Sequence, residues 1–353
     1  MLLPSRRDSA LRQRKTLSDV AKLAGVGKVT VSYVLNGRAA EARISAETSE
    51  RILAAARDLD YRPNALARML LTKQTDTIAV VFQYAEYFRS ASSFIGDVMR
   101  GVCDGCVESG VDLMLHTKTP SDLMAEADAL TDGRVDGALV LRDAHDEMME
   151  LLFTRKFPLV LFFSRSEDPS VPFVDLDNFM GGKLATNHLL ELGHRKIAML
   201  RGSPHSVSSN DRHSGFRSAL EAAGVAYRSE FVLSDAQPDY IESMVRMMTG
   251  PDRPTAIFSW SDDDAFQCMK LLTEFGLNIP GDVSIVGFDS SNACERTTPA
   301  LTSVNQPTVE MARRATQLLV QIVRNEQISG PHQIVFPPVL DIRGSTSPPS
   351  DSQ

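Results

Sequence analysis

Hydrophobic positions in the first 60 residues follow the spacing of short helices. Val20, Leu23 and Ala24 fall at i, i+3 and i+4, so they predict the apolar face of a helix capped by Thr16. Gly25 readily takes a left-handed backbone and predicts the end of that helix.

A second helix is predicted over residues 28–35, with Val31, Val34 and Leu35 turned inward. Its outer side would present Gly27, Lys28, Val29, Thr30, Ser32 and Tyr33. A helix of this kind behind a short turn is the unit that enters the DNA major groove in helix-turn-helix proteins. Thr30 and Ser32 are suited to phosphates, whereas Lys28, Val29 and Tyr33 are placed to read bases. A plain helical hairpin remains the alternative for this segment alone.

A third helix is predicted from an N-cap at Ser45 to Leu59, and a short fourth one at 65–71 after Pro63. The apolar positions of the third helix would be Ile52, Leu53, Ala56 and Leu59. The fourth segment is too short to be stable alone in water, because helix nucleation is costly. It is either a conditional helix or a plain linker.

From residue 74 onward the pattern alternates between apolar strands and amphipathic helices. Strands are predicted at 77–82, 111–116, 137–141 and 158–163, and helices at 94–109 and 121–130. A second series of strands is expected at 173–178, 197–202, 231–235, 255–260 and 283–289. This alternation predicts α/β lobes with doubly wound parallel sheets, and the length of the segment suits two lobes.

Charge divides the chain in the same way. Residues 1–73 hold 14 basic and 7 acidic side chains, and the remainder holds 23 basic and 38 acidic ones. The net charge of −8 therefore combines a basic head with an acidic body. A basic head attracts a polyanion such as double-stranded DNA.

Several long motifs, in this order, resemble the transcription regulators of the LacI/GalR (lac-repressor) family. They are DVAKLAGV-x4-VSYVLNG (19–37), ISAETSERILAAARDLDYRPNALAR (44–68), NHLLELGHRKIAML (187–200) and IPGDVSIVGFDSS (279–291). The resemblance runs from about Thr16 to Ser345. It implies a helix-turn-helix domain at 16–61, a hinge at 62–73 and a periplasmic-binding-protein-like core at 74–345, between tails expected to be disordered at 1–15 and 346–353.

The resemblance also implies the DNA-binding residues. They are Thr16, Leu17, Gly27, Lys28, Val29, Thr30, Ser32, Tyr33, Asn36, Ser45, Thr48, Tyr61, Asn64, Ala67, Arg68 and Leu70. Leu70 matches the apolar lever that this family wedges between central base pairs. Arg38 and Arg43 are either further phosphate neighbours or ordinary loop charges.

In the cleft between the lobes, the resemblance implies a small-molecule effector, such as a sugar or a related metabolite. Arg212, at the expected start of a helix, Asp289 and Tyr240 fit the family's effector positions. For Arg212 the plain alternative is an exposed arginine at a helix start, and for Asp289 it is a turn aspartate.

Two positions depart from the sugar-binding pattern, because Ser164 and Ser261 stand where relatives have Asp and Asn. The ligand would then be smaller, more anionic or more apolar than a neutral hexose, with Trp260 and Asp262 in compensating positions. The loop 84–93 either lines the cleft or is a mobile surface loop.

Other signals predict no chemistry. Cys103 and Cys106 form a single C-x2-C within a helical pattern, which is more typical of a packed helix face than of a metal or redox site. His188 and His194 fall on helix and turn positions, and Gly181-Gly182-Lys183 lacks the rest of a phosphate loop. We therefore expect no metal, no cofactor and no catalytic residue. Four cysteines without a secretory signal predict a protein of the reducing cytoplasm, and no apolar stretch is long enough to span a membrane. The family resemblance implies that the protein is bacterial and associated with the nucleoid.

Three functions compete on these observations. The first is a transcription factor, with repression the favoured direction, that binds a palindromic operator as a homodimer and is switched by an inducer or a co-repressor. The second, a transporter's solute-binding protein, would need an export signal and has no use for a basic head. The third, a nucleotide-dependent enzyme, would need a phosphate loop. The first is favoured, with no tetramerising helix expected after residue 345.

Overall fold

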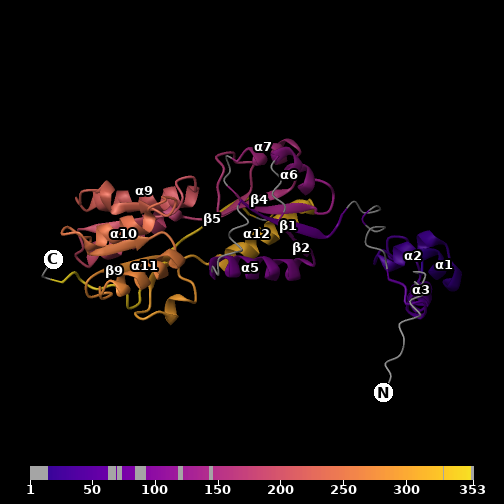
Figure 1. Ribbon diagram of the computed structural model, residues 1–353. Coiled ribbons are helices and arrows are strands. Elements are labelled where there is room, and N and C mark those ends of the chain that lie inside the picture. Colours follow the sequence, from indigo (N-terminus) through magenta and orange to yellow (C-terminus); the bar gives the residue numbers. More distant parts are fainter. Residues whose placement is uncertain are drawn as a thin grey trace, which may run out of the picture. The chain divides into compact units, whose positions relative to one another are not determined.

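The computed structural model divides the chain into two compact units, Met1–Thr75 and Asp76–Gln353 (Figure 1). We call them the headpiece and the body, and describe each by itself. The structure describes residues 15–62, 69, 74–83, 93–117, 122–142, 146–328 and 330–350.

The described residues of the headpiece form the helices α1 (Leu17–Ala24), α2 (Lys28–Leu35) and α3 (Ala46–Asp58). Thr16 and Asp19 form a capping box in front of α1, in which the Thr16 backbone N–H donates to the Asp19 carboxylate over 2.8 Å. Gly25 ends α1 with a φ of 66°. At the start of α3 the hydroxyl of Ser45 accepts from the Thr48 N–H. Both ends of α1 and the start of α3 therefore lie where local sequence chemistry favours them.

Small residues fill most of the headpiece core. Its buried members are Val20, Ala21, Ala24, Val31, Val34, Ile52, Ala55 and Ala56. The predicted apolar faces were wrong at Leu23 and Leu53, whose side chains are 54% and 41% exposed. Ala21 and Ala55 are buried in the headpiece core instead.

The body contains two six-stranded sheets, one in each of two lobes. In lobe 1 the strand order is β11-β5-β4-β3-β1-β2, and in lobe 2 it is β12-β10-β9-β8-β6-β7. The strands of lobe 1 are β1 (Thr77–Phe82), β2 (Asp112–His116), β3 (Gly137–Leu141), β4 (Leu159–Phe162), β5 (Phe173–Leu176) and β11 (Gln333–Phe336). Those of lobe 2 are β6 (Ile197–Arg201), β7 (Val232–Ser234), β8 (Ala256–Ser259), β9 (Ser284–Asp289), β10 (Thr302–Asn305) and β12 (Val339–Asp341).

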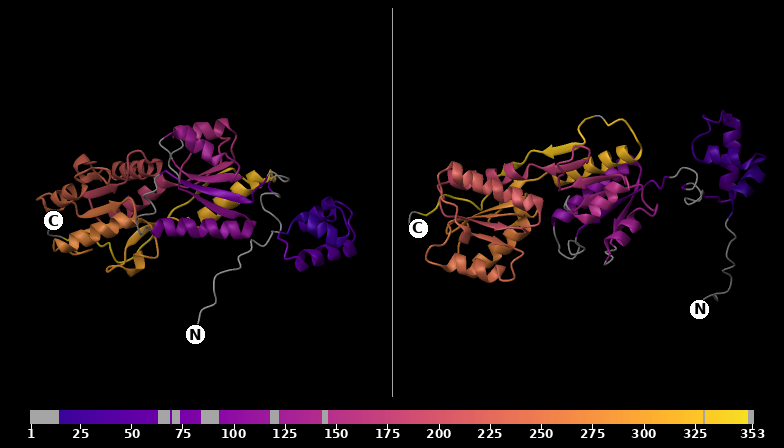
Figure 2. Two further views of the ribbon diagram at one scale, coloured as in Figure 1. Left: turned by 45° about the vertical axis from the view of Figure 1, so that its right-hand side comes forward. Right: turned by 90° about the horizontal axis from the view of Figure 1, so that it is seen from above.

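Helices cover both faces of each sheet (Figures 1 and 2). Lobe 1 carries α5 (Ser93–Ser109), α6 (Leu123–Leu130), α7 (Glu147–Thr154) and α12 (Thr308–Val323). Lobe 2 carries α8 (Asn178–Glu191), α9 (Val207–Ala222), α10 (Tyr240–Thr249), α11 (Asp262–Glu274) and two short 3-10 turns at Ser229–Phe231 and Cys294–Arg296. One hydrophobic cluster runs through both lobes, beneath α5 and α12 in one and α8 and α9 in the other.

The predicted doubly wound lobes are confirmed, with two differences in the strands. The strand at 173–176, expected to open the second series, pairs with β4 and belongs to lobe 1. Strand β12 runs antiparallel to β10, whereas every other pairing is parallel among the described residues. The chain passes between the lobes after β5, after β10 and after β11.

The C-terminal residues through 350 lie against lobe 2, although a disordered tail was predicted from 346. The buried His194 ring contacts the carbonyl oxygen of Ser347 over 2.9 Å, and the Ser347 N–H donates to the Ser284 hydroxyl over 3.0 Å. Thr346 lies 2.9 Å from Nε2 of His188. These distant partners hold a segment whose Ser- and Pro-rich composition alone indicates a loop.

None of the described helices has both the length and the apolar character needed to cross a bilayer.

Candidate functional site: the exposed side of a headpiece helix and a pocket between two lobes

Helix α2 presents an accessible outer side. Gly27, Lys28 and Val29 at its N-terminal end are exposed, and Val29 is 68% exposed although it is apolar. Thr30, Ser32 and Tyr33 are half-buried. An exposed apolar residue beside a cation at a helix N-terminus is the arrangement that can reach a thymine methyl and its neighbours.

Neighbouring residues brace this helix. The Asn36 amide donates to the Ser32 carbonyl over 2.9 Å and to the Ser32 hydroxyl over 3.2 Å, so Asn36 closes the end of α2. Arg38 lies over the Tyr33 ring and pairs with Glu41 over 2.8 Å. Arg38 is therefore partly committed within the headpiece, whereas Arg43 is exposed with a φ of 53°.

The remaining residues that were predicted to contact DNA differ in their exposure. Thr16 and Ser45 are exposed cap residues, Thr48 accepts the Ser45 hydroxyl, and Leu17 and Tyr61 pack partly against the headpiece core. The predicted hinge residues Asn64, Ala67, Arg68 and Leu70 lie outside the described residues, as does the loop 84–92.

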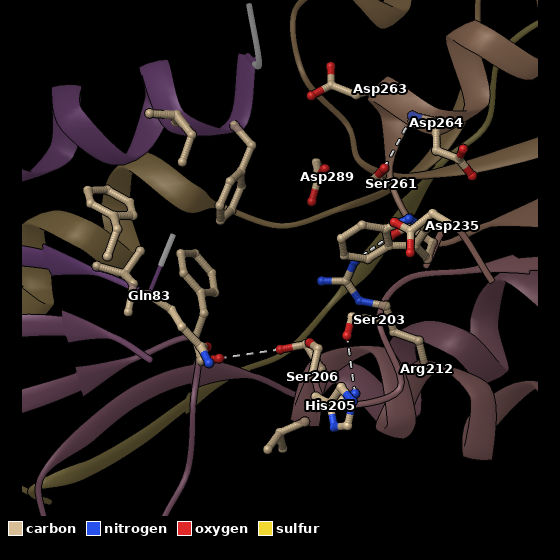
Figure 3. A pocket seen from close by; sticks show the side chains of 18 of the residues that line it. Gln83, Ser203, His205, Ser206, Arg212, Asp235, Ser261, Asp263, Asp264 and Asp289 are labelled. Carbon is tan, nitrogen blue, oxygen red and sulfur yellow. Dashed lines mark hydrogen bonds between the residues drawn. The ribbon is translucent and has the colours of Figure 1, made fainter. Parts of the chain in front are cut away.

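A pocket of about 660 Å³ opens where the two lobes of the body face each other (Figure 3). The wall from lobe 1 is mainly apolar and aromatic, and consists of Phe82, Phe94, Ile95, Leu141, Phe162 and Phe163, with Gln83, Arg142 and Ser164. The wall from lobe 2 is mixed, because Val207, Pro238, Tyr240, Ile241 and Trp260 line it as well as polar residues. Its labelled polar members in Figure 3 are Ser203, His205, Ser206, Arg212, Asp235, Ser261, Asp263, Asp264 and Asp289. Most polar groups of the pocket thus come from lobe 2, while apolar side chains come from both lobes.

Close packing of two glycine-bearing helices fixes the position of Arg212. A Cβ at Gly182 on α8 would collide with the Arg212 carbonyl group, lying 2.9 Å from its carbon. A Cβ at Gly215 on α9 would collide in the same way with the Phe179 carbonyl. The Gly-Gly-Lys segment therefore serves helix packing, and it brings the backbone of Arg212 directly onto α8.

The Arg212 side chain is almost fully buried within the pocket wall. Its Nε donates to Oδ1 of Asn178 over 2.9 Å, its Nη1 donates to the Trp260 carbonyl, and its guanidinium lies 3.5 Å from the centre of the Phe288 ring. Burial lowers the pKa of Arg212 to about 10, opposed by the charges of Asp289, Asp175 and Asp262. Arg212 was expected to start a helix, but α9 begins five residues earlier, at Val207.

Carboxylates surround this arginine. Burial raises the pKa of Asp289 well above its ordinary value, and the neighbouring Asp262 acts in the same direction while Arg212 opposes it. Gln306 donates to Asp289 over 3.3 Å. Asp264 accepts the Tyr240 hydroxyl over 2.8 Å and the Ser259 hydroxyl over 2.9 Å. Tyr240 therefore lines the pocket, while its hydroxyl is fixed by the hydrogen bond to Asp264.

The structure brings together six of the seven predicted effector residues, which are Ser164, Arg212, Tyr240, Trp260, Ser261 and Asp289. Asp262 was wrongly placed in this set. It is 1% exposed and accepts from the Ser303 hydroxyl, the Ser291 N–H and the Cys294 thiol, so it braces the wall from outside the pocket. The next residue, Asp263, lines the pocket instead. Successive helix residues point about 100° apart, so an error of one position moves a side chain off the site.

The prediction missed most of the aromatic wall. Phe82, Phe162 and Phe163 all lie at or just after the carboxyl ends of lobe 1 strands, where ligands of open α/β sheets bind, so the strand ends could have indicated them. Phe163 and Asp289 also have φ values of 56° and 108°. Non-glycine residues with a positive φ are costly, and they concentrate at ligand sites.

Comparison with known proteins finds relatives of both the headpiece and the body. Residues 16–64 match the family model "Bacterial regulatory proteins, lacI family", and residues 186–346 match "Periplasmic binding protein-like domain". The chain is 34% identical over 341 residues to the HTH-type transcriptional regulator CelR of Thermobifida fusca, covering 95% of this chain and 99% of the relative. It is 31% identical over 337 residues to the HTH-type transcriptional repressor PurR of Haemophilus influenzae, covering 94% and 98%.

Solved structures give the same result. A CelR–cellobiose complex superposes with a TM-score of 0.70 at 32% identity, covering 94% of this chain and all of that one. The lac repressor dimer bound to operator and the anti-inducer ONPF superposes with a TM-score of 0.80 at 25% identity, covering 95% and 100%. These relatives are regulators and not enzymes. The chain belongs to the lacI family of bacterial DNA-binding transcriptional regulators.

Proposed function

We propose that this regulator is a repressor that binds a palindromic operator as a homodimer. A small molecule bound in the interlobe pocket would control its affinity for the operator. The pocket carries the proposal, because it combines Arg212 and Asp289 at one wall with an aromatic wall opposite. Support also comes from the relatives, one seen with operator and one with cellobiose. Coupling requires only that effector and DNA prefer different arrangements of the body.

The charges of the pocket favour an uncharged or cationic effector. Arg142 is held by Glu126 over 2.7 Å and by Asp146 over 3.0 Å, so this buried cation is already compensated. Arg212 donates to two protein oxygens. Meanwhile Asp235, Asp263 and Asp289 line the pocket. A phosphate or carboxylate would lie beside Asp263 and the other acidic side chains of the pocket, so the proposal favours an uncharged or cationic effector over an anionic one.

The acceptor groups of the pocket also favour an effector that carries hydrogen-bond donors. The carboxyl groups of Asp263 and Asp289 line the pocket as acceptors, and the Gln306 amide donates to Asp289 over 3.3 Å. Hydroxyl or ammonium groups would satisfy these acceptors, while a ring face or an apolar edge would cover Phe82 and Phe163. A polyhydroxylated ring compound combines both features.

A thermal-shift screen of the full chain tests this proposal. Cellobiose, glucosamine, adenine and glucose 6-phosphate are compared, because a ligand at about 100 times its Kd stabilises the folded state by about 2.7 kcal/mol. We expect a neutral or amino sugar to raise the melting temperature, and Arg212→Lys to abolish the shift because lysine cannot keep both of the arginine's contacts. The matched control is Arg246→Gln, which alters an exposed arginine on α10. Selective stabilisation by glucose 6-phosphate would contradict the proposed effector chemistry.

A further inference from the structure

A buried polar network occupies the place where the chain first passes from lobe 1 to lobe 2. Arg165 follows β4 in lobe 1, and its Nε lies 2.9 Å from Oδ2 of Asp175 on β5. Its Nη2 pairs with Asp211, which lies on α9 in lobe 2. One guanidinium therefore joins a carboxylate of each lobe.

The same network continues to the pocket. Asn178, the first residue of α8, is fully buried and donates from Nδ2 to Oδ1 of Asp175 over 3.2 Å and to the Leu176 carbonyl over 3.1 Å. Its Oδ1 accepts from Nε of Arg212 over 2.9 Å. Residues 175–178 form the first crossing segment between the lobes. The side-chain amide of Asn178 therefore links Arg212 in the pocket to this segment.

A second contact spans the two lobes nearby. The Ser208 hydroxyl on α9 donates to the carbonyl oxygen of Phe163 over 3.4 Å. Phe163 lines the pocket and has the positive φ noted above. Three consecutive residues of lobe 1, from Phe163 to Arg165, thus form both the pocket wall and the contacts to α9.

The two halves of the Arg165 bridge differ in how easily they separate. Asp175 has no solvent exposure, and burial raises its pKa to about 6 while the Arg165 charge opposes the shift, so losing Arg165 would leave a buried carboxylate uncompensated. Asp211 is 30% exposed, so its carboxylate can be hydrated when it is released. A relative movement of the lobes would therefore break the Arg165–Asp211 pair and keep the Arg165–Asp175 pair.

We infer that Arg165 is a positioning residue that clasps the two lobes through Asp211 and, through Asp175 and Asn178, ties the orientation of Arg212 to the arrangement of the lobes. Its regulatory meaning rests on the proposed function, because an effector that moves Arg212 would act on this clasp. The clasp itself is a property of the free body and is testable without effector or DNA.

The experiment measures the distance between the lobes by pulsed electron paramagnetic resonance on the full chain. Cys103 on α5 in lobe 1 is an exposed native thiol, and Lys270→Cys on α11 supplies an exposed thiol in lobe 2. Cys106, Cys268 and Cys294 are buried. Labelled chain is diluted into an excess of unlabelled chain, so that only distances within one chain are recorded.

Asp211→Asn is the test substitution, because it removes the lobe 2 half of the clasp and leaves Asp175 paired. Arg246→Gln is the matched control, because it breaks the exposed pair with Asp239 within lobe 2 alone. We expect Asp211→Asn to broaden the distance distribution and add a longer population, while the control keeps the parent distribution. The distance distribution of the Arg165→Gln/Asp211→Asn double variant should equal that of Asp211→Asn, although the double variant can be less stable.

Identical distributions for the parent, Asp211→Asn and the control, in chains that melt at the parent temperature, would overturn the inference. A distribution that changes equally in Asp211→Asn and the control would overturn it too, because the effect would then not belong to the clasp. Neither result depends on operator or effector binding, so failure of the clasp is distinguishable from failure of the proposed function.

Discussion

Replacing Gly182 with alanine tests how the fold places Arg212. The added Cβ would collide with the Arg212 carbonyl group, 2.9 Å from its carbon and 3.0 Å from its Cα. These atoms are backbone, so no rotamer change relieves the overlap, and α8 and α9 must move apart. We expect Gly182→Ala to destabilise the body and to weaken effector binding, since Arg212 moves with α9.

The magnitude follows from two opposing effects. Overpacking a close contact costs about 1–3 kcal/mol, whereas alanine in place of glycine inside a helix gains about 0.5–1 kcal/mol. Gly96 on α5 isolates the second effect, because an added Cβ there meets nothing within 4 Å. The difference between Gly182→Ala and Gly96→Ala is then about 1–3 kcal/mol, or roughly 2–12 °C in melting temperature for a domain of this size.

Differential scanning calorimetry of the two variants and the parent provides the assay. We expect the order Gly96→Ala at or above the parent and Gly182→Ala clearly below it. Equal melting temperatures for the two variants would refute the reasoning, because the close approach of α8 and α9 would then not be tight in solution.

Three further predictions concern other parts of the chain. Val29→Ala should lower the affinity for a selected operator by about 1 kcal/mol while affinity for random duplex stays unchanged in gel shift, and an equal loss on both would remove Val29 from base reading. Burial, aided by Arg201 and Arg217, lowers the pKa of His213 to about 4, so its contribution to stability is present above pH 6.5 and is lost as the pH falls toward 4. Urea unfolding at pH 7.5 and pH 5 should therefore show a loss about 1–2 kcal/mol larger for the parent than for His213→Gln, and equal losses would contradict this. Leu70→Ala, in the predicted hinge, should weaken operator binding and leave the thermal shift by effector intact; unchanged operator affinity would count against a lever at this position.

Local sequence chemistry predicted the elements that are defined by their own residues. Helix α2 spans the predicted 28–35, and the Thr16 cap and the left-handed Gly25 both occur as expected. Strands β1 and β3 match the predicted 77–82 and 137–141. In each case a cap, a glycine or a continuous apolar run fixes the boundary without help from distant residues.

Features set by distant partners were not predictable in the same way. The strand at 173–176 looks like any buried strand, and only its pairing with β4 assigns it to lobe 1. Residues 346–350 depend on His194 and Ser284, more than 60 positions away in the sequence. The Arg165 clasp joins β4, β5 and α9, and no spacing within the sequence brings those three together.

In the proposed mechanism, the headpiece recognises a specific duplex and the effector-binding body controls when the duplex is released. Fluorescence anisotropy of the full chain is measured against a palindrome selected from a random pool and against a scrambled duplex, with and without the best ligand from the thermal screen. We predict tighter binding to the palindrome, affinity that falls steeply with salt, and a several-fold change in palindrome affinity when the ligand is added. Equal affinity for both duplexes, unaltered by any ligand that stabilises the body, would contradict the account.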